Sequence, residues 1–200
     1  MAEKVTQKIV DKLKQIPGNV RGAVILGGIE FLEREGGEKA IEKFKQRIKE
    51  LGLDISPEKL KPMQFYPEHL SVLVILLSAE ILNLDQKGVF RMGQENLKHS
   101  FFMKLFIHYF VSLRRTFNET PKYWQKHFDF GEIEPVELNE KERYIVVRVK
   151  GYKFHPIMCT YHAGYFLKVA QMALGSKEVT IEETKCMFRG DPYHEFVLRW

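Results

Sequence analysis

The spacing of apolar residues changes from a helical to an alternating pattern along the chain. Before Gly131, apolar residues recur every three or four positions, with breaks at Pro17-Gly18, Gly36-Gly37 and Gly52. This period predicts a series of helices. Three helical segments are expected first: 5–16, a segment that begins at 24 and ends at Gly36-Gly37, and 38–51. Two or three helices are expected between 68 and 117, and a short helix should begin at Thr120-Pro121.

Two of these segments, 70–84 and 101–110, are apolar on nearly all sides. A helix with no polar face is typical of a buried core position. The segment 70–84 is shorter than the roughly 20 apolar residues that a membrane span requires. We therefore expect two core helices and no membrane span.

After Gly131 the pattern becomes alternating, which predicts strands at 133–138, 144–150, 179–188 and 195–200. A helix is expected at 157–174, and the turn sequence at 189–192 separates the last two strands. The predicted class is α+β: a helical half packed on an antiparallel sheet of about four strands with one crossing helix. The whole chain, 1–200, would form one ligand-binding domain, with a helical part at 1–130 and a strand-rich part at 131–200.

Composition narrows the function classes but names none. The 200 residues are 44% hydrophobic and carry a net charge of +5, without a block of five Lys or Arg residues. We therefore expect no nucleic-acid partner. The amphipathic N-terminus does not resemble a signal peptide, and two cysteines are too few for a disulfide framework. These features favour a cytoplasmic protein.

Four residues of the last third could hold a metal: Cys159, Glu183, Cys186 and His194. Thiolate, imidazole and carboxylate are ligands that zinc prefers in tetrahedral sites, so zinc is the expected cofactor. On a flat strand, the odd spacing of Glu183 and Cys186 would place them on opposite faces. A bulge or twist is therefore expected between them.

Other interpretations of the same residues stay open. The two cysteines could be small buried hydrophobic residues. His155 and His162 flank Cys159 at helical spacing and are competing ligands, or the base of a catalytic thiol pair. No nucleophile motif accompanies them, so we assign no catalytic residue and favour a role without catalysis.

Aromatic residues concentrate just before the predicted sheet and in its crossing helix. They would serve either as core or as the wall of an apolar pocket with a few polar anchors. The residues expected to bind a small hydrophobic ligand are Phe102, Phe106, His108, Tyr109, Trp124 and Tyr165.

The C-terminal third resembles the 4-vinyl reductase domain, a small ligand-binding domain found in aromatic-sensing transcription activators and bacteriochlorophyll biosynthesis proteins. The resemblance rests on segments 155–159, 163–166 and 183–196, which include Glu-Thr-Lys-Cys-Met-Phe-Arg-Gly-Asp-Pro-Tyr. It implies a metal site at Cys159, Glu183, Cys186 and His194. The chain departs from the family at His194, where the family usually has Cys.

The N-terminal half resembles the haem-nitric-oxide/oxygen-binding (H-NOX) domain of the same superfamily, through segments 20–24 and 93–98. The stretch 124–131 is similar to one in an uncharacterised bacterial family of that superfamily. Haem binding in H-NOX domains implies a proximal histidine, for which His108 and His127 are candidates, and a Tyr-x-Ser-x-Arg clamp for the propionates. Tyr144 to Arg148 has Val146 in place of Ser, and Gly151-Tyr152-Lys153 lacks both Ser and Arg. We therefore do not expect haem.

The sequence thus predicts a sensor-like domain with an apolar pocket and a structural zinc site. The alternatives are a haem-based gas sensor of the H-NOX type and a partner-binding adaptor without a ligand. A signal would have to pass through a partner protein or a homodimer interface.

Overall fold

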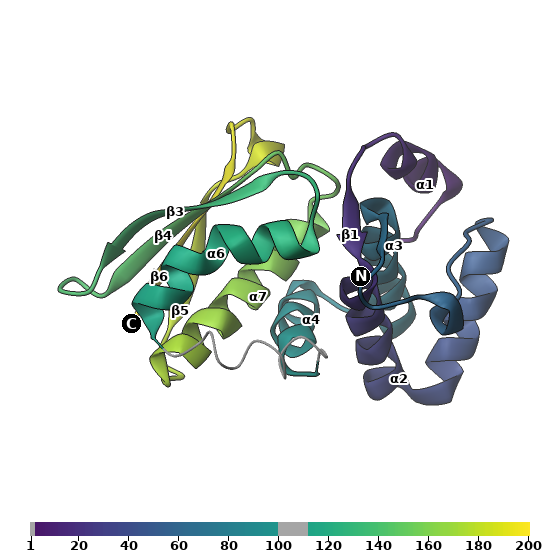
Figure 1. Cartoon of the computed structure of the whole chain (residues 1–200). Helices are drawn as coiled ribbons and strands as arrows, with labels where there is room; N and C mark the ends of the chain where they lie inside the picture. Colours follow the sequence, from purple (N-terminus) through teal and green to yellow (C-terminus); the bar gives the residue numbers. More distant parts are fainter. Residues whose placement is uncertain (1–2, 100–111) are drawn as a thin grey trace.

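The computed structural model describes residues 3–99 and 112–200, and its elements follow the predicted order of helices and then strands (Figure 1). The helices are α1 Gln7–Lys14, α2 Gly22–Glu50, α3 Glu68–Leu82, α4 Gln86–His99, α6 Leu113–His127 and α7 Ile157–Leu174. The strands are β1 Asn19–Arg21, β2 Phe65–Pro67, β3 Glu132–Asn139, β4 Tyr144–Lys150, β5 Thr180–Lys185 and β6 His194–Arg199. The α+β class is confirmed. The helix expected at 101–110 lies outside the described residues.

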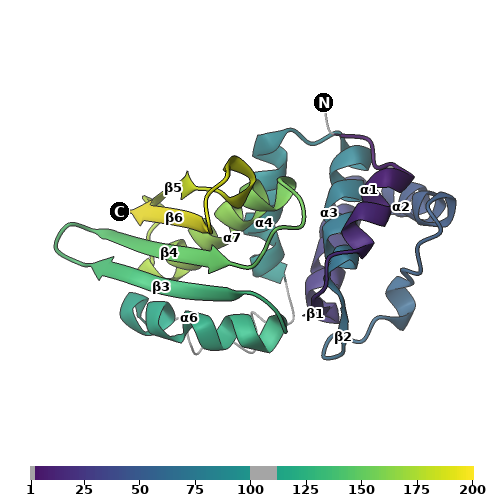
Figure 2. The same cartoon turned by 90° about the horizontal axis from the view of Figure 1, so that it is seen from above.

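The larger sheet is antiparallel with the strand order β3-β4-β6-β5. Helices α6 and α7 lie side by side on one of its faces (Figures 1 and 2). Ile145, Val147 and Val149 of β4 are buried, while Arg148 pairs with Glu195 on the opposite face. This alternation is what a sheet covered on one side requires. The prediction of one crossing helix is therefore incomplete, because α6 shares that face with α7.

Helix α6 begins earlier than the sequence predicted. The side chain of Ser112 caps it by accepting a hydrogen bond from the Arg115 N–H at 3.3 Å. Pro121 lies inside the helix rather than at its first turn. The hydroxyl of Thr120 donates to the Thr116 carbonyl at 2.8 Å. The Thr-Pro pair looked like a helix start because both residues suit one, but the tertiary fold continues the helix through it.

The expected helix end at Gly36-Gly37 is a kink. Gly37 has φ 63° and ψ −164°, while the residues on both sides are helical, so α2 continues to Glu50. A positive φ is readily adopted by glycine because it has no Cβ. The glycine thus turns the chain and restarts the helix without a connecting loop.

Helix α3 forms the centre of the helical half. All residues from 71 to 79 are buried, as its all-round apolar pattern predicted. Of the described helices, none is long and apolar enough to cross a membrane. The first residue of α3, Glu68, is buried as well and faces the strand-rich half, as described below.

Helices α1 to α4 meet the sheet and its two covering helices where α4 packs against α7. A Cβ at Gly93 would lie 2.0 Å from the Tyr161 carbonyl oxygen, and one at Gly164 would lie 2.0 Å from the Phe90 carbonyl oxygen. Only glycine allows backbones to approach this closely. A second contact joins β1 to the segment between α6 and β3: the Asp129 carboxylate accepts from the Asn19 backbone and side-chain nitrogens at 2.7 Å each.

Candidate metal centre and aromatic core

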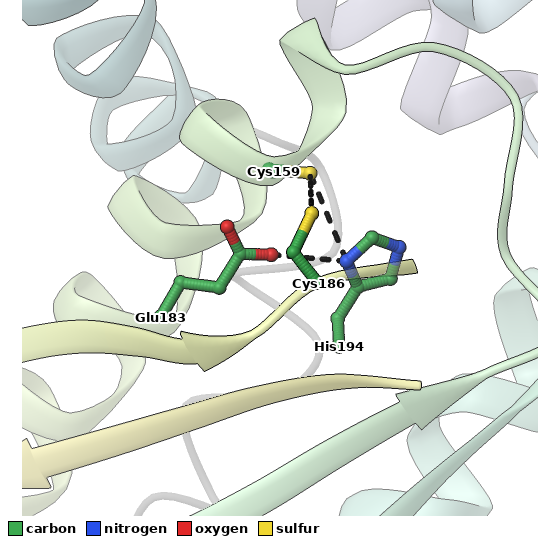
Figure 3. Close-up of side chains that lie close together, drawn as sticks. All are labelled: Cys159, Glu183, Cys186 and His194. Atoms are coloured by element: carbon green, nitrogen blue, oxygen red, sulfur yellow. Dashed lines mark hydrogen bonds and ion pairs between the residues drawn. The ribbon is translucent and has the colours of Figure 1, made fainter. Parts of the chain in front are cut away.

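The side chains of Cys159, Glu183, Cys186 and His194 converge at the edge of the sheet (Figure 3). Their ligand atoms all lie within 4.8 Å of one another. The Cys159 Sγ lies 3.6 Å from the Cys186 Sγ and 3.7 Å from the His194 Nδ1. This is a compact group of two thiols, one imidazole and one carboxylate, drawn from three elements.

Local structure explains how these elements reach one point. Cys159 lies in the first turn of α7. The pairing of β5 with β6 shifts register between Glu183 and Lys185, as the odd spacing of Glu183 and Cys186 required. The chain then turns through Gly190, at φ 100°, and returns as β6 with His194 as its first residue. Asp191 holds this turn, because its carboxylate accepts from the Cys186 N–H at 2.8 Å.

Both ring nitrogens of His194 face oxygen acceptors. Nε2 lies 3.0 Å from the Tyr152 carbonyl oxygen, and Nδ1 lies 2.9 Å from the Glu183 Oε1. A neutral imidazole carries one N–H, so when Nε2 donates to the carbonyl, Nδ1 turns a lone pair toward the carboxylate. That contact is favourable only with a proton or a cation between the two atoms. A histidine that ligates a metal through one nitrogen and donates to a carbonyl through the other has this arrangement.

The acidities in the cluster respond to burial and to mutual contact. Burial raises the pKa of the Cys159 thiol, and the nearby Glu183 carboxylate raises it further. Burial is the largest influence on Glu183 and raises its pKa, but the contacts with His194, Cys159 and Cys186 together act in the opposite direction, so the pKa is lowered. A thiol with a raised pKa is not an activated nucleophile. The cluster therefore suits metal binding better than thiol catalysis.

The competing histidines lie outside this cluster. The Nδ1 of His155 accepts from the Ile157 N–H at 3.2 Å, and its Nε2 lies 3.3 Å from the Glu3 carboxylate. His162 is buried among aromatic rings, with its ring centroid 4.7 Å from that of Tyr152. Burial lowers the pKa of His162 to about 3, so its imidazole stays neutral.

Trp124 lies in a packed aromatic cluster. Its ring stacks on Phe128 at a centroid distance of 4.3 Å, and its Nε1–H donates to the Phe130 carbonyl at 2.9 Å. Tyr165 is partly exposed and touches the ring of Phe166. The other residues predicted to line a pocket lie outside the described part of the chain: Phe102, Phe106, His108 and Tyr109. A ligand role for any of the six stays a prediction.

A buried acid that is linked to the metal-ligand cluster through Tyr152 was missed by the sequence reasoning. Glu68 is 0% exposed, and its Oε1 accepts from the hydroxyls of Tyr152 and Ser71. Its Oε2 is buried and has no hydrogen-bond partner among the described residues. Burial raises the pKa of Glu68 to about 8, although both hydrogen bonds act in the opposite direction. The acidic residue at a helix start gave no signal of burial, because that position also suits a solvated charge.

Comparison with solved structures identifies the fold. A structure of an H-NOX protein from S. oneidensis in the Fe(II)NO state aligns with a TM-score of 0.66 at 13% identity, covering 90% of this chain and 98% of that one. An oxygen-binding H-NOX domain related to soluble guanylate cyclases aligns with a TM-score of 0.60 at 14% identity, over 90% and 93% of the two chains. A structure from a study of haem distortion in the H-NOX family aligns with a TM-score of 0.66 at 13% identity, over 90% and 94%. The chain therefore has an H-NOX-like fold.

Comparisons by sequence give no family. No protein-family profile matches the chain, and no curated protein matches it. The assignment to the 4-vinyl reductase family thus has no support beyond the motif residues, whereas the H-NOX resemblance is supported at the level of the fold.

The cofactor prediction is wrong. We expected zinc and did not expect haem, yet the similar structures are H-NOX domains, and one of them comes from a study of haem distortion. The prediction failed because it relied on the missing propionate clamp. Arg148 is bound to Glu195 at 2.7 Å on the outer face of the sheet, and the hydroxyls of Tyr144 and Tyr152 donate to Glu137 and Glu68. A haem in this fold would have to be held without those three residues.

Proposed function

We propose that this protein is a sensor domain of the H-NOX type that binds a diatomic gas through haem. The observation that carries the proposal is the likeness of the fold, which extends over 90% of this chain and 98% of an H-NOX protein in its Fe(II)NO state. Reversible coordination of such a gas is the chemistry that haem supplies when bound. The readout would pass to a partner protein or to a second copy of the chain, as the sequence predicts.

The histidines that would hold the haem iron are taken from the described residues, because His108, the other candidate that the sequence offered, lies outside them. His162 is buried, outside the metal-ligand cluster, and its low pKa keeps the imidazole in the neutral form that binds iron. His127 is the alternative on α6, and its Nδ1 lies 2.8 Å from the Tyr123 carbonyl oxygen. Without the Tyr-x-Ser-x-Arg clamp, a haem would have to be held mainly by one of these histidines and by apolar contacts.

Haemin titration of the purified protein tests this proposal. We expect a Soret band that saturates at one haemin per chain and that shifts when the reduced protein is exposed to CO or NO. His162→Ala should abolish the saturable band, whereas His127→Ala, the matched control, should retain it. A spectrum of unbound haemin throughout the titration would refute the proposal, and the reverse order of the two variants would refute the choice of ligand.

We also propose that Cys159, Glu183, Cys186 and His194 bind one metal ion. The favouring observation is the placement of their four ligand atoms within 4.8 Å of one another, with His194 already oriented by the Tyr152 carbonyl. The ion would tie the start of α7 to the ends of β5 and β6. A closed set of four protein ligands is typical of a structural site.

Cobalt(II) is a suitable probe, because thiolate ligation produces absorption bands that free cobalt lacks. We expect these bands at one ion per chain in the reduced protein, together with a higher melting temperature. Cys186→Ser should remove at least half of the band intensity, because only the Cys159 thiolate remains. Glu183→Gln should weaken them, while Glu182→Gln, an exposed neighbour on the same strand, should not. Thiolate bands of unchanged intensity in Cys186→Ser would refute the site, and this result would leave the haem proposal untouched.

A further inference from the structure

The two cysteines of the chain lie next to each other among the ligands of the proposed metal ion. The Cys159 Sγ and the Cys186 Sγ are 3.6 Å apart, although the residues are 27 positions apart in the sequence. Figure 3 shows the two sulfurs side by side, one from the first turn of α7 and the other from the chain that follows β5. The sequence has no third cysteine. Each thiol therefore has the other as its sole partner for a disulfide within the chain.

The local backbone allows the remaining distance to close. A disulfide bond holds its sulfurs at about 2.05 Å, so the two would have to approach by roughly 1.5 Å. The pairing of β5 with β6 ends at Lys185. The hydrogen bonds of the Cys186 backbone are made with Arg189 and Asp191, within the turn that follows. This turn can therefore move toward α7 without breaking strand pairs.

The two thiols differ in exposure, which gives them different roles in an oxidation. Cys159 is partly exposed, whereas Cys186 is 4% exposed. A dissolved oxidant therefore reaches Cys159 first. An accessible thiol beside a second thiol favours reversible oxidation to a disulfide over further oxidation. Because burial raises the pKa of Cys159, its first attack should be slow, but the reply of Cys186 needs no second encounter.

We propose that Cys159 and Cys186 form a redox modification site at which hydrogen peroxide closes a disulfide and thereby releases the bound metal ion. The Cys159 thiolate attacks one peroxide oxygen, so an S–O bond forms, the O–O bond breaks and hydroxide leaves. The Cys186 thiolate then attacks the sulfenic sulfur, so the S–S bond forms, the S–O bond breaks and a second hydroxide leaves. Each hydroxide takes up one proton that a thiol has lost. Two thiols and one peroxide thus give one disulfide and two waters.

Closure of the disulfide removes both sulfur ligands from the metal ion. Glu183 and His194 alone would remain of the four ligands, too few for a closed structural site. The disulfide would keep the start of α7 tied to the end of β5, whereas the link to β6 through His194 would be lost. Release of the ion rests on the metal site proposed above. Closure of the disulfide does not, because both thiols belong to the chain itself.

The reduced, metal-free protein tests closure of the disulfide. One equivalent of hydrogen peroxide should remove both free thiols, and dithiothreitol should restore them. A tryptic map without reductant should show peptide 154–168 joined to peptide 186–189. Disulfides between chains, or sulfinic acid on Cys159 beside a reduced Cys186, would overturn the proposal.

Two single variants test the roles of the thiols. In Cys186→Ser, a sulfenic acid that reacts with dimedone should accumulate on Cys159. In Cys159→Ser, the buried Cys186 should keep its thiol at the same dose of peroxide. Equal oxidation of the remaining thiol in both variants would overturn the assigned roles. If either variant does not fold, the peptide map of the unchanged sequence decides.

The zinc-loaded protein tests release of the ion. Peroxide should transfer zinc to a colorimetric chelator at one ion per disulfide formed, and the protein should bind zinc again after reduction. A disulfide that forms while zinc stays bound would overturn the release step. Failure of the reduced protein to bind zinc would refute the metal site and the release step together. The disulfide would still be judged on the metal-free protein.

Discussion

Replacement of Glu68 by Gln should change how the stability of the protein depends on pH. The carboxyl group is 0% exposed, and burial raises its pKa to about 8 from an ordinary value of 4.5. The unfolded chain therefore releases this proton near pH 4.5, while the folded chain retains it until about pH 8. Folding stability is thus lost progressively as the pH rises between these values, and the loss is complete above the folded pKa.

The magnitude follows from the size of the shift. At about 1.4 kcal/mol per pKa unit, the penalty above pH 8 is on the order of 5 kcal/mol. Gln has nearly the same size and cannot ionise, so the variant should not carry this penalty. Near pH 4 the variant should be slightly less stable than the wild type. The Gln amide nitrogen would take the place of Oε2, where the described residues offer no hydrogen-bond partner, so its N–H groups would be buried without an acceptor.

Urea denaturation of both proteins at pH 4, 6, 8 and 9 measures the difference directly. The two free energies of unfolding should cross, with the variant the more stable protein at the alkaline end. Other titrating groups, including His162, are common to both proteins and cancel in the comparison. Parallel curves over this range would refute the reasoning, because they would mean that Glu68 ionises equally in both states.

Three further substitutions test contacts on which the fold relies. Tyr152→Phe removes a hydrogen-bond donor to the buried acid, and urea denaturation should show a loss of about 1–3 kcal/mol, with a steeper decline toward alkaline pH. Gly164→Ala places a Cβ 2.0 Å from the Phe90 carbonyl oxygen and should lower the urea midpoint by an amount equivalent to about 1–3 kcal/mol; an unchanged midpoint would contradict the close helix contact. Glu80→Gln weakens the acceptor of the Val5 N–H, at 2.6 Å, and should accelerate tryptic cleavage within α1; equal cleavage rates would contradict this anchor.

Local patterns predicted most of the fold. The all-round apolar character of α3 indicated its burial, and the alternation of β4 indicated which face is covered. The start of α6 was not predictable from local sequence, because Thr120-Pro121 suits a first helical turn and proline is disfavoured inside a helix, yet Pro121 lies within α6. Its continuation depends on packing against the sheet, which is not encoded within that window.

The candidate metal site was predictable to the extent that ligand chemistry is local. Residue types and the turn before His194 brought the four ligands together, and their odd spacing indicated the register shift in β5. The group that orients His194 and the buried acid that contacts Tyr152 could not be found this way. The orienting group for His194 is a backbone carbonyl, that of Tyr152, and any residue type could provide it. Glu68 is distant in sequence from Tyr152, and only the tertiary fold joins them.

Tyr152 connects the metal-ligand cluster to the buried acid Glu68, so that the two form one structural unit. Its carbonyl oxygen lies 3.0 Å from the His194 Nε2, and its hydroxyl donates to Glu68 in the helical half. Tyr152 is buried and makes one of these contacts with its backbone and the other with its side chain, so it has little room to adjust to one without disturbing the other. Any metal bound by His194 would therefore fix the position from which Tyr152 reaches Glu68. It follows that the stability contributed by the metal ion and the pH dependence caused by Glu68 should not be additive, since contacts that share a residue are coupled.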